Sequence, residues 1–147
     1  MITVGKAPYR ISLLGGGSDL DWFLNEETQG ISIGYSLNKF SYSIVNVLDE
    51  NSKSGILNYS VRENYTKIDS IVHPLIKEAL KISNIKNYIE LSTFGFATGG
   101  SGLGGSSCFL LSLLAALKNR ENYRLNPEEL AAEVCDIEIN RLKKPIG

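Results

Sequence analysis

Apolar and polar residues alternate with a period of two along several short stretches of the chain. Between residues 39 and 47, aromatic and aliphatic side chains alternate with serines, which is typical of a half-buried antiparallel strand. Similar apolar stretches, separated by turn residues, predict further strands. These lie at residues 2–4, 10–14, 31–35, 56–61 and 88–93.

Two other segments have the spacing of helices. Apolar residues recur every three or four positions between residues 71 and 80, and Asp69 or Ser70 is expected to cap this helix. Residues 106–117 are apolar on nearly all sides, which predicts a helix that is buried on every face.

A third helix is predicted over residues 126–142. Asn126 suits its N-cap, Pro127 suits the first helical position, and two glutamates follow at the positive end of the helix dipole. Strands followed by helices, with hairpins among the strands, predict an α+β fold. We expect a mostly antiparallel sheet packed on helices.

The length and net charge of the chain limit the kinds of partner that it is expected to bind. The chain has 147 residues and a formal net charge of −1, so no basic face is implied and neither nucleic acid nor a membrane surface is an expected partner. No apolar run is long enough to cross a bilayer, and the first residues lack the pattern of a signal peptide. Cys108 and Cys135 fall in helical patterns, as expected for reduced thiols of a cytoplasmic protein.

The segment "ATGGSGLGGSSC", residues 97–108, separates a predicted strand from the apolar helix. Glycines allow backbone N–H groups to approach a ligand closely, and the N-terminus of a helix attracts anions. Phosphate is therefore the expected ligand.

Two general phosphate-binding motifs fit poorly. A P-loop would need a lysine after the glycines, and none follows.

A dinucleotide-binding unit is the second alternative. Gly100, Gly102 and Gly105 match its G-x-G-x-x-G pattern after a predicted strand. That unit needs a second parallel strand after the helix, whereas here a polar segment and another helix follow. An NAD-binding oxidoreductase therefore stays a weaker hypothesis.

Two glycine-rich segments together resemble the first two signature motifs of the GHMP kinases, which include galactokinase, homoserine kinase and mevalonate kinase. The first motif has the form A-P-x-R-x-x-x-x-G-x-x-x-D, and the second G-x-G-L-G-S-S. The matching residues are Ala7, Pro8, Arg10, Gly15 and Asp19 in the first, and Gly100, Gly102, Leu103, Gly104 and Ser106 in the second. The "RISLLGGGSDL" form is most similar to the D-glycero-D-manno-heptose 7-phosphate kinase branch.

The resemblance implies a ribosomal protein S5 domain 2-like fold and a sugar kinase. The expected reaction is ATP-dependent phosphorylation of a sugar-phosphate hydroxyl, with heptose 7-phosphate at its anomeric position as acceptor. ATP and Mg²⁺ are the implied cofactors. Another GHMP sugar kinase, similar to fucokinase or galactokinase, and an inactive nucleotide-binding remnant are the alternatives.

The resemblance also implies roles for residues of the second motif. The loop that would bind the ATP phosphates comprises Gly100, Ser101, Gly102, Leu103, Gly104, Gly105, Ser106 and Ser107. Ser106 would ligate Mg²⁺, with Ser107 as the alternative, and Glu138 in "CDIEIN" is the positional match for the family's metal-binding glutamate. Capping of the helix is the structural alternative for both serines.

Residues of the first motif would act on the acceptor. Arg10 would stabilise charge near the transferred phosphoryl group. Gly15, Gly16 and Gly17 would let the sugar phosphate approach the backbone, and Asp19 would accept hydrogen bonds from sugar hydroxyls. Structural alternatives are an ion pair for Arg10, a tight turn for the glycines and a helix cap for Asp19.

The chain differs from the family pattern in places and is shorter than its members. Thr98 and Gly99 stand where a proline is usual, and Gly105 replaces a serine. The resemblance makes residues 1–147 an N-terminal ATP-binding domain, with a C-terminal half expected elsewhere, including an aspartate base soon after Gly147. We expect the chain alone to bind nucleotide weakly and not to catalyse transfer, and self-association is left open.

Overall fold

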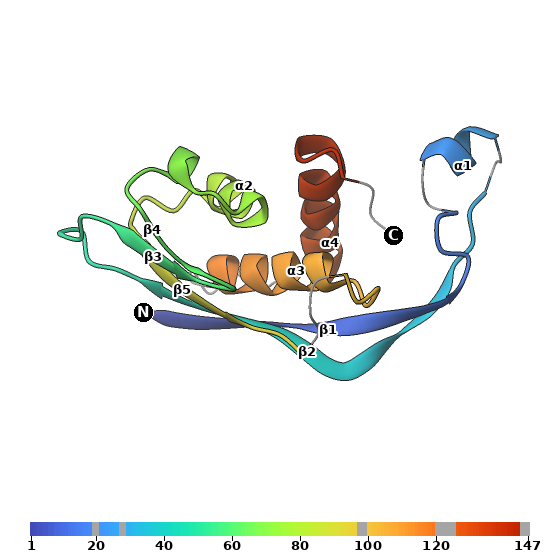
Figure 1. Ribbon diagram of the computed structural model, residues 1–147, viewed down its shortest axis with the longest axis horizontal. Coiled ribbons are helices and arrows are strands. Elements are labelled where there is room, and N and C mark those ends of the chain that lie inside the picture. Colours follow the sequence, from blue (N-terminus) through green and yellow to red (C-terminus); the bar gives the residue numbers. More distant parts are fainter. Residues whose placement is uncertain (19–20, 27–28, 97–99, 120–125, 145–147) are drawn as a thin grey trace.

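The computed structural model describes residues 1–18, 21–26, 29–96, 100–119 and 126–144. These residues form a five-stranded sheet in the order β1-β2-β5-β3-β4, and helices α2, α3 and α4 lie on one of its faces (Figure 1). The strands are β1 (Ile2–Leu14), β2 (Ile33–Val47), β3 (Gly55–Asn58), β4 (Arg62–Tyr65) and β5 (Ile89–Phe94). The helices are α1 (Asp21–Glu26), η1 (Ile68–Ser70), α2 (Pro74–Ile82), α3 (Gly105–Lys118), α4 (Pro127–Cys135) and η3 (Asp136–Arg141).

The predicted α+β class is confirmed. The pairs β1–β2, β2–β5 and β3–β4 are antiparallel, and β3 pairs with β5 in parallel. The strand predicted at residues 56–61 exists as β3 but ends at Asn58, and β4, which was not predicted, pairs with it as a hairpin. The sheet is not the parallel, doubly wound sheet of a dinucleotide-binding domain.

Strand β1 runs unbroken through Pro8, so the prediction of two short strands around this proline was wrong. The strand lies at the edge of the sheet, where a missing N–H breaks no ladder on its open side. The pairing with β2 shifts its register between Pro8 and Arg10, which absorbs the irregularity. Strand β2 is also continuous, whereas the sequence predicted two strands at residues 31–35 and 39–47.

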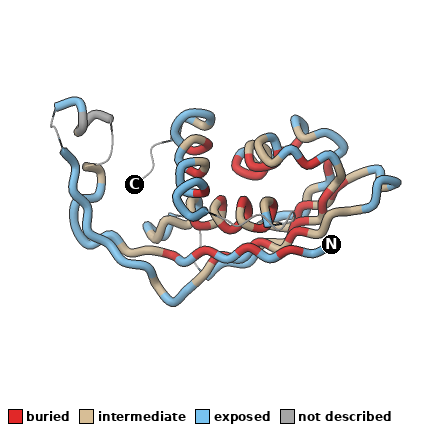
Figure 2. The backbone as a smooth tube through the Cα atoms, turned by 180° about the vertical axis from the view of Figure 1, so that it is seen from behind, coloured by how far each residue is buried: buried red, intermediate tan, exposed pale blue. Residues whose placement is uncertain are grey.

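The distal parts of β1 and β2 leave the sheet as a two-stranded arm that carries α1 at its end (Figure 1). Strand β5 pairs with β2 from Tyr42 to Val47, so among the described residues the first part of β2 pairs with β1 alone. The arm is mostly exposed (Figure 2), and several of its apolar side chains face solvent. These are Leu13, Leu14, Ile33 and Tyr35.

Helix α3 is the buried helix that the sequence predicted. It lies against β1 and β2, and Leu110, Leu113 and Leu114 are fully buried in the main core. Strand β1 approaches this helix so closely that a Cβ on Gly5 would lie 1.8 Å from the carbonyl oxygen of Ser112. The Thr3 hydroxyl donates to the Ala116 carbonyl at 2.7 Å, which fixes the strand on the helix.

The predicted cap of α2 was wrong. Residues Ile68–Ser70 form a separate 3₁₀ turn, and α2 begins at Pro74 with His73 as its N-cap. Proline disfavours helical conformation in the residue before it, which places the boundary there. By contrast, α4 begins as predicted, since Asn126 accepts a hydrogen bond from the N–H of Glu128.

The end of the predicted third helix differs from its pattern. The α-helical part, α4, ends at Cys135, and the next residues form the π-helix η3 without a break.

No helix in the described ranges is long and apolar enough to cross a membrane.

Candidate functional site

The glycine loop adopts a conformation that requires glycine. Gly100, Gly102 and Gly104 have φ angles of 80°, 73° and 70°, so every second residue is in the left-handed region. A Cβ added at Gly100, Gly102 or Gly105 would meet no atom within 4 Å. The loop therefore presents bare backbone to open space, directly before the first turn of α3, where the helix dipole is positive.

Ser106 and Ser107 contact Glu138 across the fold. The Ser106 hydroxyl donates to Oε1 of Glu138 at 2.6 Å, and the Ser107 hydroxyl donates to Oε2 at 2.7 Å. The N-cap of α3 is Gly104, which makes no side-chain capping bond. Both serines thus use their hydroxyls on the glutamate, and neither caps the helix as the structural alternative assumed.

Glu138 is a buried carboxylate, with 2% of its surface exposed. Within the ranges that the structure describes, no lysine, arginine or histidine lies within ion-pairing distance of it. A buried negative charge without a cation is costly, and two hydroxyl donors offset only part of that cost. Burial raises the pKa of the Cys108 thiol; nearby Arg10 opposes that shift, and the charge of Glu138 adds to it.

Arg10 lies beside the glycine loop. Its Nη1 donates to the Gly102 carbonyl at 2.8 Å, and its backbone N–H donates to the Leu103 carbonyl at 3.3 Å. A Cβ on Gly104 would lie 3.2 Å from the guanidinium carbon. The Leu103 side chain packs on a small buried cluster, and Ser101 is exposed. That cluster comprises Ala7, Tyr9 and Cys108.

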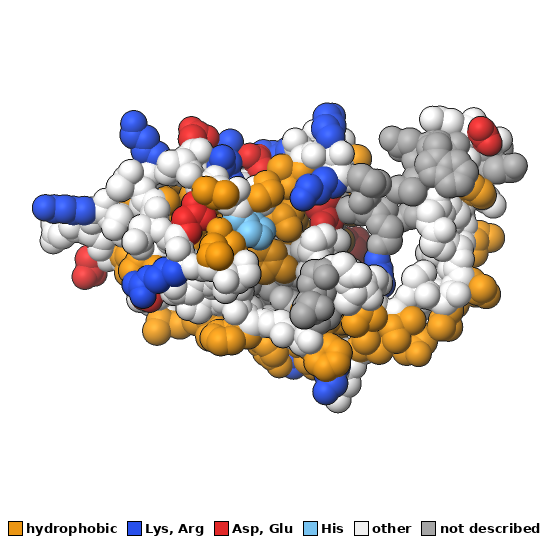
Figure 3. All heavy atoms as spheres, viewed as in Figure 1, with side chains coloured by type: hydrophobic (Ala, Val, Ile, Leu, Met, Phe, Trp, Pro, Cys, Tyr) orange, Lys and Arg blue, Asp and Glu red, His pale blue; other side chains and the backbone are white. Residues whose placement is uncertain are grey.

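A cavity of about 370 Å³ opens on one side of the N-terminus of α3. Gly105 and Ser106 line it together with aromatic rings, those of Tyr9, Tyr59, His73, Phe94 and Phe109. The His73 ring makes edge contacts with two of them, with centroids at 4.8 Å from Tyr59 and 5.5 Å from Phe109. The histidine, pale blue in Figure 3, lies among hydrophobic side chains on the face drawn there.

His73 has a defined tautomer. Its Nδ1 accepts the N–H of Ile76 at 3.4 Å, so the ring proton of the neutral form is on Nε2. Burial lowers the pKa of His73, with nearby Glu63 opposing and Lys144 reinforcing that shift. The ring is therefore neutral at physiological pH.

A second cavity, of about 360 Å³, lies along the β1–β2 arm. Arg10 and Gly16, both predicted to act on the acceptor, line it together. Its other lining residues are Ser12, Ser32, Gly34, Tyr35 and Ser36, so hydroxyl groups predominate. Arg10 therefore lies between the polar cavity, which it lines, and the glycine loop, to which it donates a hydrogen bond.

The three glycines of the first motif have different surroundings. Gly15 has a φ angle of 79°, and a Cβ there would lie 1.9 Å from the Ile31 carbonyl oxygen, so this glycine allows a tight turn. Gly17 also has a positive φ, of 90°. Gly16 faces the cavity and has room for a Cβ. Asp19 lies outside the described residues.

Comparisons of structure identify the fold. A D-glycero-D-manno-heptose 1-phosphate kinase from Bacteriodes thetaiotaomicron matches the whole chain with a TM-score of 0.83 and 24% identity. The chain has the fold of the GHMP kinases. The same fold is found in the mevalonate kinase of Methanococcus jannaschii, which matches 98% of this chain with a TM-score of 0.72 and 18% identity. It is also found in the Lactococcus lactis galactokinase complexed with galactose, which matches 99% of this chain with a TM-score of 0.75 and 17% identity.

The matches cover only part of those proteins. This chain corresponds to 51% of the heptose kinase chain, 48% of the mevalonate kinase and 39% of the galactokinase. No family model matches the sequence, and no curated protein matches it. The likeness to the GHMP kinases is thus one of fold.

Sequence reasoning missed the aromatic cavity. Tyr59 follows β3, His73 precedes α2 and Phe109 lies in α3, so the three residues come from separate parts of the chain and no motif links them. The sequence did contain one usable signal, because a histidine directly before Pro74 is held at the start of a helix.

Proposed function

We propose that the chain is the ATP-binding domain of a sugar kinase, spanning residues 1–147. The observation that carries this proposal is the buried Glu138 carboxylate, held by the hydroxyls of Ser106 and Ser107 at the end of the glycine loop. A phosphate chain at the loop and a cation at the carboxylate would neutralise one another. Phosphoryl transfer depends mainly on such positioning and charge neutralisation.

The triphosphate of ATP would bind along the glycine loop. Backbone N–H groups of Gly105, Ser106 and Ser107 begin α3 and have no partner in the preceding turn of that helix. The open space beside Gly100 and Gly102 leaves room for phosphate oxygens. The nucleobase would enter the aromatic cavity beside the loop, where Tyr59 and Phe109 offer ring faces and edges.

The residues present fit a magnesium ion. Mg²⁺ is held by oxygen ligands, commonly one or two carboxylates together with substrate phosphates and water. Ser106 and Glu138 would be the protein ligands, and Ser107 would keep its bond to the carboxylate. Within the described ranges no cluster of three or more Asp, Glu, His or Cys occurs, which suits an ion that depends on the nucleotide. When bound, the ion supplies positive charge to the β- and γ-phosphates.

The acceptor sugar would occupy the polar cavity along the arm. Serine hydroxyls and the Tyr35 ring suit a polyol, and the Arg10 guanidinium suits a phosphate or the transferred group. We propose a heptose 7-phosphate, phosphorylated at its anomeric hydroxyl. The matched Bacteriodes protein is named for a heptose 1-phosphate, so both phosphates belong in the test.

The chemistry is a displacement at the γ-phosphorus. The acceptor oxygen bonds to that phosphorus while the bond to the β–γ bridging oxygen breaks, and ADP leaves with the electron pair. Arg10 would stabilise the charge that spreads over the γ-oxygens. The described residues lining the acceptor cavity include no carboxylate and no histidine. We propose that the acceptor proton passes to an aspartate outside residues 1–147.

Phosphoryl transfer to a panel of acceptors tests this proposal. The panel contains heptose 7-phosphate, heptose 1-phosphate, galactose, fucose and mevalonate, and ADP formation is measured against a reaction without acceptor. It is run with this chain and with any longer gene product that contains it. We expect turnover with a heptose phosphate in the longer product, abolished by Gly104→Val. Turnover with none of the acceptors, in a folded longer product, would overturn the sugar kinase assignment.

A further inference from the structure

Glu138 lies on a π-helix that a pair of side chains holds in shape. Helix η3 spans Asp136–Arg141, and the N–H of Leu142 donates to the Ile137 carbonyl at 2.9 Å, the five-residue spacing of a π turn. Asp136, the first residue, accepts hydrogen bonds from Asn140 at 2.9 Å and from Nε of Arg141 at 2.8 Å. The two ends of the π-helix are thus tied to each other.

The π turn changes which residues face the core. Leu130, Val134 and Ile137 are buried at the spacing of an α-helix, and Arg141 would be the next inward position. Instead, Leu142 packs against the core, and the Arg141 side chain is 41% exposed. The extra residue therefore turns Arg141 outward.

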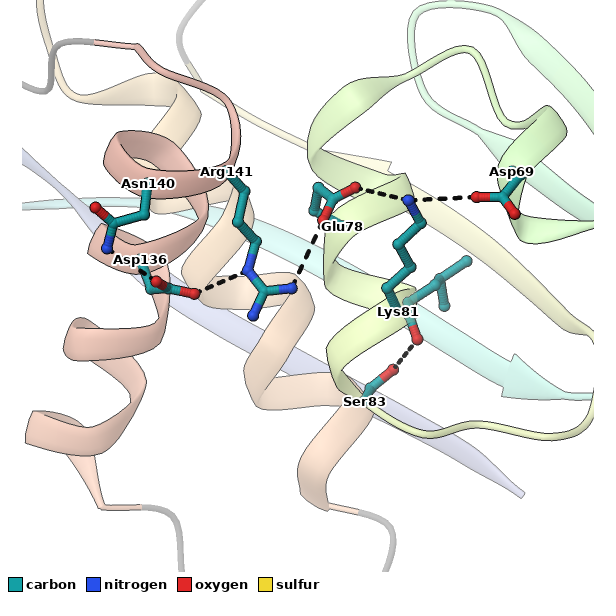
Figure 4. Close-up of polar contacts among 8 residues, drawn as sticks. Asp69, Glu78, Lys81, Ser83, Asp136, Asn140 and Arg141 are labelled. Atoms are coloured by element: carbon teal, nitrogen blue, oxygen red, sulfur yellow. Dashed lines mark hydrogen bonds and ion pairs between the residues drawn. The ribbon is translucent and has the colours of Figure 1, made fainter.

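Arg141 also connects the π-helix to α2. Its Nη1 lies 3.7 Å from Oε2 of Glu78, and Glu78 in turn pairs with Lys81 at 3.1 Å (Figure 4). In Figure 4 the guanidinium lies between Asp136 on one helix and Glu78 on the other. These two partners restrict the position of η3 relative to α2.

We propose that Arg141 is a positioning residue for Glu138, an inference that rests on the proposed function. By binding Asp136 across the π turn and Glu78 on α2, Arg141 fixes the turn from which the Glu138 carboxylate reaches Ser106 and Ser107. Arg141 lies outside that contact and acts through the backbone between residues 136 and 141.

Lys81 provides a matched control. It is 40% exposed, close to the 41% of Arg141, and it also pairs with two carboxylates, those of Asp69 and Glu78. It makes no bond to η3 in the described structure. Exposed ion pairs contribute little to stability, so Arg141→Gln and Lys81→Gln are both expected to fold.

The test is the affinity for a non-hydrolysable ATP analogue, measured with excess Mg²⁺ and with EDTA. We expect the gain in affinity that Mg²⁺ gives to fall by about threefold in Arg141→Gln, with its EDTA affinity unchanged from wild type. Lys81→Gln should keep the full gain, and Arg141→Lys should recover part of it. In the metal-free chain, amide hydrogen exchange across residues 136–141 should rise in Arg141→Gln alone.

The outcomes separate the two claims. If wild type shows a Mg²⁺-dependent gain and Arg141→Gln keeps it, the positioning role is wrong while the proposed function stands. Equal losses with Mg²⁺ and with EDTA would also overturn the role, because they indicate a general structural effect. If wild type binds the analogue equally with and without Mg²⁺, the proposed metal site is wrong and the inference falls with it.

Discussion

The hydroxyl of Ser106 and the carboxylate of Glu138, 32 positions apart in the chain, meet at 2.6 Å. The serine begins α3 beside the glycine loop, and the glutamate comes from a π-helix packed over the same end of that helix. Their contact places a buried negative charge where a helix N-terminus and bare backbone favour an anion. A cation bound between the carboxylate and a phosphate group would neutralise the charges of both.

Glu138→Gln is predicted to stabilise the metal-free chain. The amide keeps the shape and can still bond both serines, while the buried charge is removed. We expect the free energy of unfolding, measured by urea titration with EDTA, to rise by about 0.5–2 kcal/mol. A decrease would mean that the carboxylate is stabilised by its surroundings without any cation.

Gly104→Val is predicted to damage the loop, and Gly105→Ala is its control. Gly104 has a φ angle of 70° and its Cβ would meet the Arg10 guanidinium, so we expect a cost of at least about 1–2 kcal/mol and loss of nucleotide binding. Gly105 is helical and has open space, so alanine there should leave the stability of the fold unchanged or slightly raised. Urea unfolding compares the stabilities of the two variants, and calorimetric titration with an ATP analogue measures binding; unimpaired binding by Gly104→Val would contradict the role of the loop.

Gly5→Ala is predicted to separate β1 from α3. The new methyl would overlap the Ser112 carbonyl oxygen at 1.8 Å, and neither backbone can move without disturbing the core. We expect destabilisation of about 1–3 kcal/mol in urea unfolding. Gly16→Ala, whose Cβ would lie 3.8 Å from the nearest atom, should leave stability within experimental error. Similar stabilities for the two variants would show that the close approach does not exist.

His73 is predicted to make stability depend on pH. Its folded pKa lies below the ordinary value of about 6.5, so the folded state favours the neutral ring. Its contribution is complete above that value and is lost as pH falls through it toward the folded pKa. Protonation of Nδ1 would also remove the acceptor for the N–H of Ile76.

His73→Asn removes this titration and keeps a side-chain acceptor at the N-cap. We expect the midpoint temperature of thermal unfolding to fall in wild type when the pH is lowered from about 7.5 to about 5.5, and to fall less in the variant. An equal shift in both proteins would assign the pH dependence to other groups.

Apolar periodicity predicted the buried α3, and the run of glycines predicted the loop before it. The resemblance to the GHMP kinases implied that Ser106 and Glu138 share one site, and the structure brings their side chains into contact. The sequence did not predict the unbroken β1, since Pro8 argues against a strand unless the strand is known to lie at an edge. The π-helix was also missed, because the five-residue step from Ile137 to Leu142 is visible only once the core partners of both residues are known. The aromatic cavity depends on separate segments of the chain that only the tertiary fold brings together.

The most direct test of the account is the affinity of the 147-residue chain for a non-hydrolysable ATP analogue, measured with and without Mg²⁺ in wild type, Ser106→Ala and Glu138→Gln. The account predicts that Mg²⁺ tightens binding in wild type by at least about tenfold and that each variant loses most of that gain. It also predicts that neither variant binds the analogue more weakly than wild type in EDTA, because the loop is intact and Glu138→Gln removes a negative charge beside the phosphates. A wild-type chain that is folded and gains nothing from Mg²⁺ would contradict the central claim that Ser106 and Glu138 form a nucleotide-dependent metal site.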